Sequence, residues 1–446
     1  MKLEDHPTVK WHRSQVSTAE ARTKPAVLDT DYLKELCLKS GADDAGFVDI
    51  CRPALVEQMP DIEYALPGTK TVVALAFRLH RENIRTMAHS VTNLEFQQTW
   101  SHAKHVGRVI CKALGSRGVG ALNVPAGFPY ESDRWPGKMW LTSDKIIAEE
   151  ASLGRMGLNR LVLHPRFGSF MILGTILLDT EVSRYDEPIE FNPCVQCKLC
   201  ASVCPVGAIA PDGHFDFFSC YTHNYRERLS GFSDWIETVA SAGSRKQYRS
   251  KVTDSETVSM WQNLAIGAQT KCDRCVAVCP AGEQGIGEFL EDRKAYVERL
   301  LKPFRDRSEV IYAVPGSDAE AHVAAHFPNK TVKRISNGLR PNSVQGFLQS
   351  LPLVFQRYRS EGLNATFHFT FTGEESCKGT AVIRDKTLQV HDNHVGESDL
   401  HLIADSRTWL RFLAKEKSML SAIVTGKIRI KGSPRLMKAF ARCFPS

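Results

Sequence analysis

Eight of the thirteen cysteines lie between residues 194 and 279, and their spacing is the feature of the sequence that most directly suggests chemistry. The first run reads Cys194-Val-Gln-Cys197-Lys-Leu-Cys200-Ala-Ser-Val-Cys204-Pro205, which is C-x2-C-x2-C-x3-C-P. In such a run three closely spaced thiolates bind one iron–sulfur cubane, and the fourth binds a neighbouring cluster. The run therefore predicts two 4Fe–4S clusters.

A second run, Cys272-Asp-Arg-Cys275-Val-Ala-Val-Cys279-Pro280, is one thiolate short of a complete ligand set. Cys220 is the remaining cysteine of this region, so ligand counting assigns it as the eighth ligand. The crossover of the bacterial ferredoxin pattern then divides the ligands between two clusters. We call the two groups set one (Cys194, Cys197, Cys200 and Cys279) and set two (Cys204, Cys220, Cys272 and Cys275).

Zinc is the alternative metal, because zinc ribbons also use C-x2-C pairs. Zinc does not require three cysteines within seven residues followed by C-x3-C-P, and it would not explain a second such run. Lone cysteines are more typical of small buried hydrophobes, and five residues fit that description: Cys37, Cys51, Cys111, Cys377 and Cys443. Two low-potential clusters in one fold predict single-electron transfer to an acceptor.

The composition restricts the class of protein further. A chain of 446 residues predicts two or three domains, and 43% hydrophobic with 24% charged residues is typical of a soluble protein. No apolar stretch approaches the roughly 18 residues that a membrane-spanning helix needs. The polar start lacks a secretory or transit signal, so we expect a cytoplasmic protein with reduced cysteines. The net charge of +7 is spread out, which makes a nucleic-acid partner unexpected.

The elements that must position the cysteines follow from hydrophobic periodicity. After an N-terminal extension (1–28), residues 29–185 read as α/β, with a helix at 32–37 and strands at 71–76 and 170–178. The cysteine-rich part (186–300) is expected to be ferredoxin-like, and the cysteine motifs are followed by a charged helical stretch at 289–304. A connector (301–335) contains a strand at 310–314.

From residue 336 to 446 the pattern changes to that of a separate α+β domain. A helix at 342–358 precedes alternating strands at 364–372, 379–384 and 387–391. Helices are expected around 406–415 and at the C-terminus. The whole chain is therefore predicted to be an α+β multidomain protein.

From about residue 30 to 290 the sequence resembles the cobalamin-dependent reductases that include epoxyqueuosine reductase and the reductive dehalogenases. The segment Ala151-Ser-Leu-Gly154-Arg-Met-Gly157-Leu-Asn159 is similar to the family's A-G-L-G-x-x-G-x-N, and 163–170 is similar to its L-x-P-x-F/Y-G-S. Cys220, within Phe215-Asp-Phe-Phe-Ser-Cys220-Tyr, falls where epoxyqueuosine reductases place an isolated cluster ligand.

This resemblance implies a nitroreductase-like α/β core that holds a corrinoid against the clusters, without a protein histidine on cobalt. The residues that it implies as corrinoid contacts are Gly157, Asn159, His164, Arg166, Phe167, Gly168 and Ser169. The residues alone also allow plainer interpretations. Gly154 and Gly157 could end a helix, 165–168 could be an ordinary turn, and His164 could be a hydrogen-bonded structural histidine.

The proton donor does not match the family cleanly. Epoxyqueuosine reductases place an acid about a dozen positions before A-G-L-G, whereas dehalogenases use a tyrosine supported by a basic residue. A reductase needs a donor near its substrate with a pKa tuned by burial. Asp144 and Tyr130 are the candidates, although each could be an ordinary surface group.

The last hundred residues resemble the sterol carrier protein type-2 family, on the segments 367–374, 399–404 and 424–432. The resemblance implies an apolar tunnel for a lipid-like ligand. The side chains expected to point inward are Leu410, Phe412, Leu413, Leu420, Ile423, Leu436 and Phe440. The alternative is that this stripe only fills a core.

Two functions follow from the sequence. The first is a reductase that takes electrons from a ferredoxin- or flavodoxin-type donor through both clusters to a corrinoid and an apolar organic substrate. The second is an electron-transfer module with a lipid-binding tail and no corrinoid. A transfer RNA substrate is a third and weaker possibility, because no basic stripe is evident.

Overall fold

The computed structural model describes residues 2–16, 24–134 and 139–446. An antiparallel sheet forms the centre of the N-terminal part, in the strand order β2-β3-β7-β4. Its strands are β2 (Asp44–Asp49), β3 (Thr71–Arg78), β7 (Met171–Leu178) and β4 (Ala121–Val124). The expected strands at 71–76 and 170–178 are thereby confirmed.

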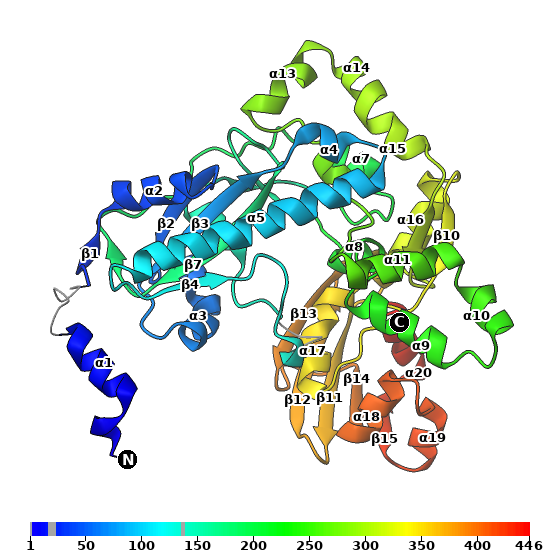
Figure 1. The fold of residues 1–446 in the computed structure, drawn as a ribbon. Coiled ribbons are helices and arrows are strands. Elements are labelled where there is room, and N and C mark those ends of the chain that lie inside the picture. Colours follow the sequence, from blue (N-terminus) through cyan, green and yellow to red (C-terminus); the bar gives the residue numbers. More distant parts are fainter. Residues whose placement is uncertain (1, 17–23, 135–138) are drawn as a thin grey trace.

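Helices cover both faces of this sheet. One face packs against α2 (Thr30–Lys39) and the long α5 (His89–Gly115), which runs across the sheet in Figure 1. The other face packs against α3 (Met59–Ala65) and α6 (Asp144–Glu150), with η2 (Pro53–Gln58) beside them. Because helices shield both faces, the β3 segment Val72–Phe77 is apolar throughout rather than alternating. Short strand pairs complete this part: β1 (Val27–Leu28) with β8 (Glu181–Val182), and β5 (Arg155–Met156) with β6 (Val162–Leu163).

The cysteine-rich part carries its ligands on short helices. Cysteines lie on or beside α7 (Leu199–Val203), α8 (Phe217–Asn224) and α12 (Arg274–Ala277). Helix α8 begins at an N-cap, Asp216, whose carboxylate accepts a hydrogen bond from the Ser219 amide. Between the two cysteine runs the chain forms α9 (Ser230–Ala240), α10 (Arg245–Lys251) and α11 (Asp254–Ala265). The charged stretch that follows forms α13 (Glu283–Glu291), α14 (Arg293–Tyr296), the π-helical η4 (Val297–Leu301) and α15 (Lys302–Asp306).

The expected connector, residues 301–335, contains a folded β–α–β unit. Its strands β9 (Val310–Ala313) and β10 (Thr331–Arg334) pair in parallel around α16 (Asp318–His326). Ile311 and Phe327 of this unit pack in one core cluster with Cys204, so the unit braces the cysteine-rich part. The domain boundaries themselves remain predictions.

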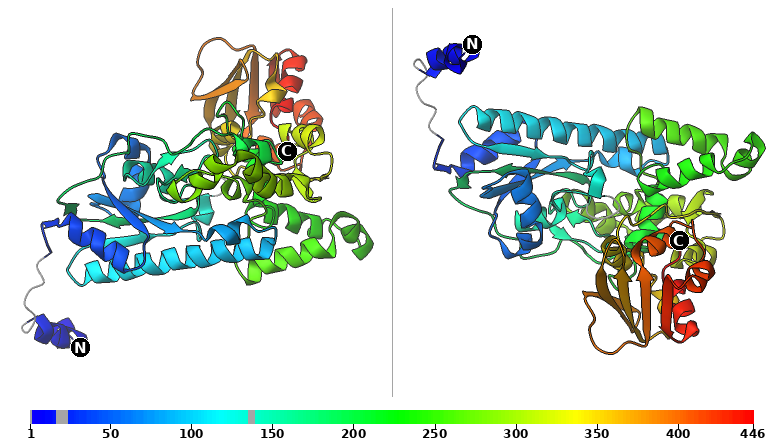
Figure 2. Two further views of the ribbon diagram at one scale, coloured as in Figure 1. Left: turned by 90° about the horizontal axis from the view of Figure 1, so that it is seen from above. Right: turned by 90° about the horizontal axis from the view of Figure 1, so that it is seen from below.

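The C-terminal part is a five-stranded sheet in the order β13-β12-β11-β14-β15, covered by helices. The strands are β11 (Ala365–Thr372), β12 (Cys377–Arg384), β13 (Thr387–Asp392), β14 (Leu400–Asp405) and β15 (Ile428–Gly432). The helices are α17 (Val344–Val354), α18 (Ser406–Leu413), α19 (Met419–Val424) and α20 (Pro434–Arg442). Both views in Figure 2 place this domain to one side of the N-terminal sheet. The expected α+β multidomain fold is confirmed.

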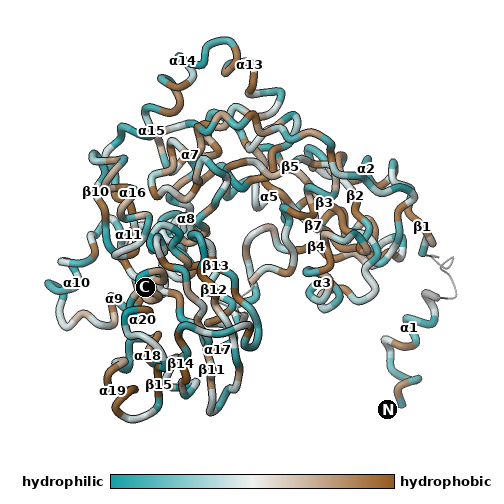
Figure 3. Tube along the Cα trace, turned by 180° about the vertical axis from the view of Figure 1, so that it is seen from behind, coloured by the Kyte–Doolittle hydropathy of each residue, from teal (hydrophilic) through white to brown (hydrophobic). Residues whose placement is uncertain are grey.

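The inward direction expected for α19 is wrong. Leu420 is 77% exposed and Ile423 is 42% exposed, whereas Ala422 is the buried side chain of this helix. A helix of six residues buries only one narrow face, and here that face falls on the small residue. Figure 3 shows α19 as an apolar segment at the edge of the domain. The other five expected side chains do pack on the domain core, namely Leu410, Phe412, Leu413, Leu436 and Phe440.

No helix within the described ranges combines the length and apolar character needed to cross a membrane.

Candidate functional site

Set one gathers around a small cavity. Cys194, Cys197, Cys200 and Cys279 all line it, together with the buried Asn159. Burial and then the neighbouring thiols of Cys279, Cys197 and Cys194 raise the pKa of Cys200 to about 12. The first run can converge because Gln196 and Lys198 take left-handed backbone conformations, with φ of 49° and 60°. The four thiols predicted to share a cluster therefore lie together.

Set two gathers in the same way. Burial raises the pKa of Cys220, and the thiols of Cys204 and Cys272 raise it further. Burial is also the main reason that the pKa of Cys275 is raised, followed by Cys272, Cys220 and Cys204. Cys200 of set one adds to the shift at Cys275, so the two sets adjoin.

This arrangement fits two iron–sulfur clusters. Burial and mutual repulsion disfavour free thiolates within each set, and bound iron would supply the positive charge that stabilises them as ligands. Within the part of the chain that the structure describes, no group of three or more His, Cys, Asp or Glu side chains is arranged around a single metal ion. The assignment of each cysteine to its cluster remains a prediction.

The turn at residues 164–169 fastens the N-terminal sheet to the second cysteine run. Gly168 has φ +64°, and a Cβ atom there would lie 1.9 Å from the Ala281 carbonyl oxygen. Between the same two segments the Glu283 amide donates a hydrogen bond to the Pro165 carbonyl at 2.8 Å. Ser169 Oγ donates to the Val276 carbonyl at 3.2 Å. We call this contact the glycine seam.

His164 is fully engaged by protein groups. Its Nε2 lies 3.1 Å from Asp44 Oδ2, and its Nδ1 accepts a hydrogen bond from the Arg166 amide at 3.1 Å. Its ring stacks on Phe167 at 4.3 Å. Although burial opposes ionisation of Asp44, hydrogen bonds from His164 and Lys34 hold the pKa of that carboxyl below its usual value.

The other expected corrinoid contacts are also used within the protein. Asn159 Nδ2 donates to the Cys275 carbonyl at 3.4 Å, and the Gly157 amide donates to the Leu161 carbonyl at 2.8 Å. The Arg166 guanidinium lies 4.8 Å from the Phe167 ring centroid. Asn159, Gly168 and Ser169 thus contact the loop of the second cysteine run, whereas His164 pairs with Asp44. The role of all seven residues as corrinoid contacts remains a prediction.

Polar side chains that the sequence analysis did not connect with the clusters lie beside set two. Lys145 and Tyr225 each interact electrostatically with both Cys220 and Cys275. Arg228 is 6% exposed and lies 4.1 Å from the Tyr225 ring centroid, yet its Nε and Nη1 find no acceptor among the described residues. Unsatisfied guanidinium donors beside aromatic rings fit a group rich in amide carbonyls and phosphate, which a corrinoid is.

Sequence reasoning did not single out Tyr225 or Arg228. The signal was present, because Tyr225-Arg226-Glu227-Arg228 follows five to eight residues after the isolated ligand Cys220. Aromatic and charged residues this close to a cluster ligand are candidates for contact with a cofactor or substrate.

The two proton-donor candidates differ in their surroundings. The Asp144 carboxylate accepts hydrogen bonds from Thr175 Oγ1 at 2.7 Å and Thr142 Oγ1 at 3.3 Å, and burial raises its pKa to about 6. Tyr130 packs in an aromatic cluster with Met139 and Tyr221, and burial raises its pKa. Neither role is tested by this geometry.

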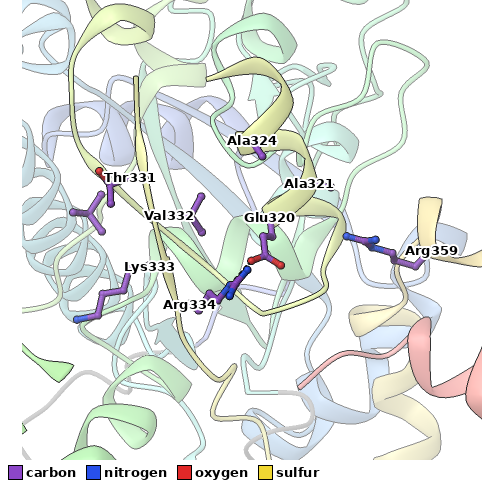
Figure 4. Close-up of a pocket in the computed structure, with 9 residues that line it drawn as sticks. Glu320, Ala321, Ala324, Thr331, Val332, Lys333, Arg334 and Arg359 are labelled. Carbon is purple, nitrogen blue, oxygen red and sulfur yellow. Dashed lines mark hydrogen bonds and ion pairs between the residues drawn. The ribbon is translucent and has the colours of Figure 1, made fainter. Parts of the chain in front are cut away.

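A further groove lies on the β9–α16–β10 unit, where Figure 4 shows Glu320 and Arg334 directed toward one another. They form an ion pair at 2.5 Å, and Arg359 at the rim lies 3.7 Å from Asp318. Lys333 pairs with Glu256. Because these charges are already paired within the protein, the groove offers little to a ligand.

Two segments of the chain match known protein families. Residues 188–210 match the 4Fe-4S binding domain, and residues 356–445 match the SCP-2 sterol transfer family. These matches confirm the expected fusion of an iron–sulfur part with a sterol-carrier-type part.

Curated relatives are epoxyqueuosine reductases. The protein of Bacillus anthracis is 29% identical over 138 residues, which cover 31% of this chain and 29% of the relative. That of Francisella cf. novicida is 25% identical over 166 residues, covering 35% and 44%. The Escherichia coli protein is 35% identical over 80 residues, covering 18% and 21%. The chain thus spans less than half the length of these relatives.

Two solved structures share the similarity. Epoxyqueuosine reductase from Streptococcus thermophilus is 15% identical with a TM-score of 0.32, covering 61% of this chain and 75% of that chain. The catabolic reductive dehalogenase NpRdhA is 16% identical with a TM-score of 0.35, covering 68% and 38%.

Proposed function

We propose that this protein is a corrinoid-dependent iron–sulfur reductase of an apolar organic substrate. The observation that carries the proposal is the gathering of eight cysteine thiols into two adjoining sets of four. The similarity to epoxyqueuosine reductases, which are oxidoreductases, supports the reaction class. The SCP-2 match supports an apolar substrate.

In this proposal electrons enter at set one and leave from set two. Phe191 and Val195, next to the set-one loop, are 59% and 50% exposed and offer a contact to a ferredoxin- or flavodoxin-type donor. Set two lies beside Lys145, Tyr225 and Arg228 instead. Adjoining clusters allow single electrons to pass between them.

The clusters supply one-electron transfer, and a bound corrinoid would supply a reducible cobalt centre that acts on the substrate. Arg228 and Lys145 would hold its amide and phosphate oxygens, with the seven residues at 157–169 as the further predicted contacts. Tyr130 and Asp144 remain the proposed proton donors. We place the protein in the cytoplasm, where thiols stay reduced, and propose no nucleic-acid partner.

The test is anaerobic reconstitution of the full chain with iron, sulfide and hydroxocobalamin, followed by reductive titration under absorption spectroscopy. We expect cluster bleaching together with the bands of protein-bound, reduced cobalamin. Clusters that are reduced without any retained corrinoid would favour the electron-transfer module instead. Failure to assemble clusters would overturn both functions.

A further inference from the structure

Two arginines lie at the ends of the short helix α4 (Arg81–Arg85), which packs on the second cysteine run. Ile84 of this helix shares a core cluster with Val278, the residue before the proposed set-one ligand Cys279. The same cluster includes Val203 of α7, and Figure 1 shows α4 beside α7. We call the two arginines of α4 the arginine pair.

The Arg81 guanidinium is enclosed by protein next to set one. Its central carbon lies 4.1 Å from the centroid of the Phe170 ring, and Nη2 donates a hydrogen bond to the Phe167 carbonyl at 3.1 Å. A Cβ atom at Gly285 would lie 2.6 Å from Nη1, so the guanidinium packs directly against α13. Nη1 is buried and has no acceptor among the described residues. Arg81 therefore holds its charge away from water.

Arg85 is 8% exposed and is connected to the loop of Cys279 through Tyr296. Its Nη2 donates a hydrogen bond to the Tyr296 hydroxyl at 3.4 Å. That hydroxyl in turn donates to the Val278 carbonyl at 3.3 Å. Both members of the arginine pair are thus held against the segment that carries a set-one ligand.

Nearby carboxylates offset the charge of the arginine pair only in part. Arg85 pairs with Glu288 at 3.2 Å, but that side chain is 50% exposed and also pairs with Arg299 at 2.9 Å. Burial, followed by the charge of Arg85, lowers the pKa of Arg81. Burying positive charge without a compensating anion is unfavourable. Arg81 interacts electrostatically with Cys279, and a 4Fe–4S cluster with four thiolate ligands would supply the missing negative charge.

We infer that the arginine pair raises the midpoint potential of the set-one cluster. Reduction adds an electron to a cluster, so a positive charge beside it stabilises the reduced state more than the oxidised state. Water screens a buried charge less than an exposed one, which makes the effect of the pair large. Electrons that enter at set one are thereby captured more readily. The inference rests on the proposed function only for this direction of electron flow.

Both midpoint potentials can be measured without corrinoid or substrate. The full chain is reconstituted anaerobically with iron and sulfide, and spin resonance follows each cluster during a redox titration, with Cys220→Ala assigning the set-one signal. In Arg81→Met and Arg85→Met we expect the reduction equilibrium of set one to become about tenfold less favourable, which is ~59 mV for one electron. The set-two potential should change much less. Arg81→Lys keeps the positive charge and should stay close to the wild type.

Two further variants separate charge from packing. Glu288→Gln removes the carboxylate that offsets Arg85, so it should raise the set-one potential, which is the opposite sign to the methionine variants. Arg293→Met is the matched control, because Arg293 also interacts electrostatically with set one, through Cys197, but is exposed on α14. It should lower the potential less, and added salt should remove its effect. Damage to packing alone would not produce shifts of opposite sign.

The outcomes are distinct. An unchanged set-one potential in Arg81→Met overturns the inference, as does an equal fall in Arg81→Lys or in Arg293→Met. If the methionine variants lose the set-one cluster, Glu288→Gln decides, because a higher potential supports the inference and an unchanged or lower one overturns it. A protein that shows the expected shifts but retains no corrinoid would fail only the proposed function.

Discussion

Cys220 is the one proposed ligand that lies outside both cysteine runs, so the division into two clusters depends most on this residue. Its thiol lies with those of Cys204 and Cys272, and its helix α8 begins at the Asp216 cap. Spacing could place the other seven cysteines by pattern, whereas Cys220 was assigned by counting. In the structure Cys220 lies with the other thiols of set two, where the ligand count had assigned it.

Replacing Cys220 with Ala should therefore remove one cluster. Because the two clusters use different cysteines, we expect iron and acid-labile sulfide to fall from about eight to about four per chain, with set one retained. Chemical analysis and spin resonance of the reduced protein measure this. Cys51→Ala, at an exposed lone cysteine, is the control. Equal loss of both clusters would refute the division, and no loss would remove Cys220 from the ligands.

Asp144 gives a pH prediction at the same scale. Burial raises its pKa to about 6, above the value near 3.9 of an unfolded chain. The folded state thus holds this proton more tightly, and the resulting stabilisation is present at low pH and is lost as the pH rises through about 6. Relative to Asp144→Asn, the wild-type free energy of unfolding should fall between pH 5 and pH 8. Urea midpoints at both pH values measure this, and parallel profiles would contradict it.

At the scale of elements, the sequence located helices and strands well but not the way in which they contact one another. The strands at 71–76 and 170–178 were predictable because their apolar runs are strong and local. The buried face of α19 was not predictable, because a six-residue helix carries too little periodicity to define a face. The glycine seam was not predictable either, because Gly168 and Ala281 are far apart in the sequence and only the folded structure brings them into contact.

The seam predicts a large effect of Gly168→Ala. The new Cβ would clash with the Ala281 carbonyl, whereas Gly213→Ala shares a positive φ but meets nothing within 4 Å. The control should cost about 1 kcal/mol of unfolding free energy for its backbone conformation. Gly168→Ala should cost roughly 2 kcal/mol more, with weaker cluster retention. Denaturant titration compares the two, and similar losses in both variants would mean that the contact is not tight.

At the scale of the whole molecule, the segment at 337–340, between strand β10 and the C-terminal domain, is itself part of the packing. A Cβ at Gly338 would lie 2.0 Å from the Ser230 carbonyl, and Arg340 pairs with Glu237 of α9. Asn337 and Leu339 line a cavity of about 690 Å³ between helix α8 and the C-terminal domain, which we call the junction cavity. The sequence predicts the two domains but not the cavity between them, because only their packing in the folded chain brings its walls together.

Because helix α8 and the C-terminal domain share this cavity, we expect a bound ligand to change the midpoint potential of one cluster. Helix α8 carries Cys220 of set two, and its residues Phe217 and Tyr221 line the junction cavity. A bound molecule would exclude water from this side of α8. Because reduction adds negative charge to a cluster, and water stabilises that charge, the midpoint potential of set two should fall while that of set one changes little.

Redox titration under spin resonance, with and without the apolar sterol ketone cholestan-3-one as ligand, measures both potentials. The Cys220→Ala variant assigns the signals, since it should retain set one alone and show no ligand-dependent shift. A ligand that shifts both clusters equally would act through the whole fold rather than through α8. A saturating ligand that shifts neither would separate the junction cavity from the electron path.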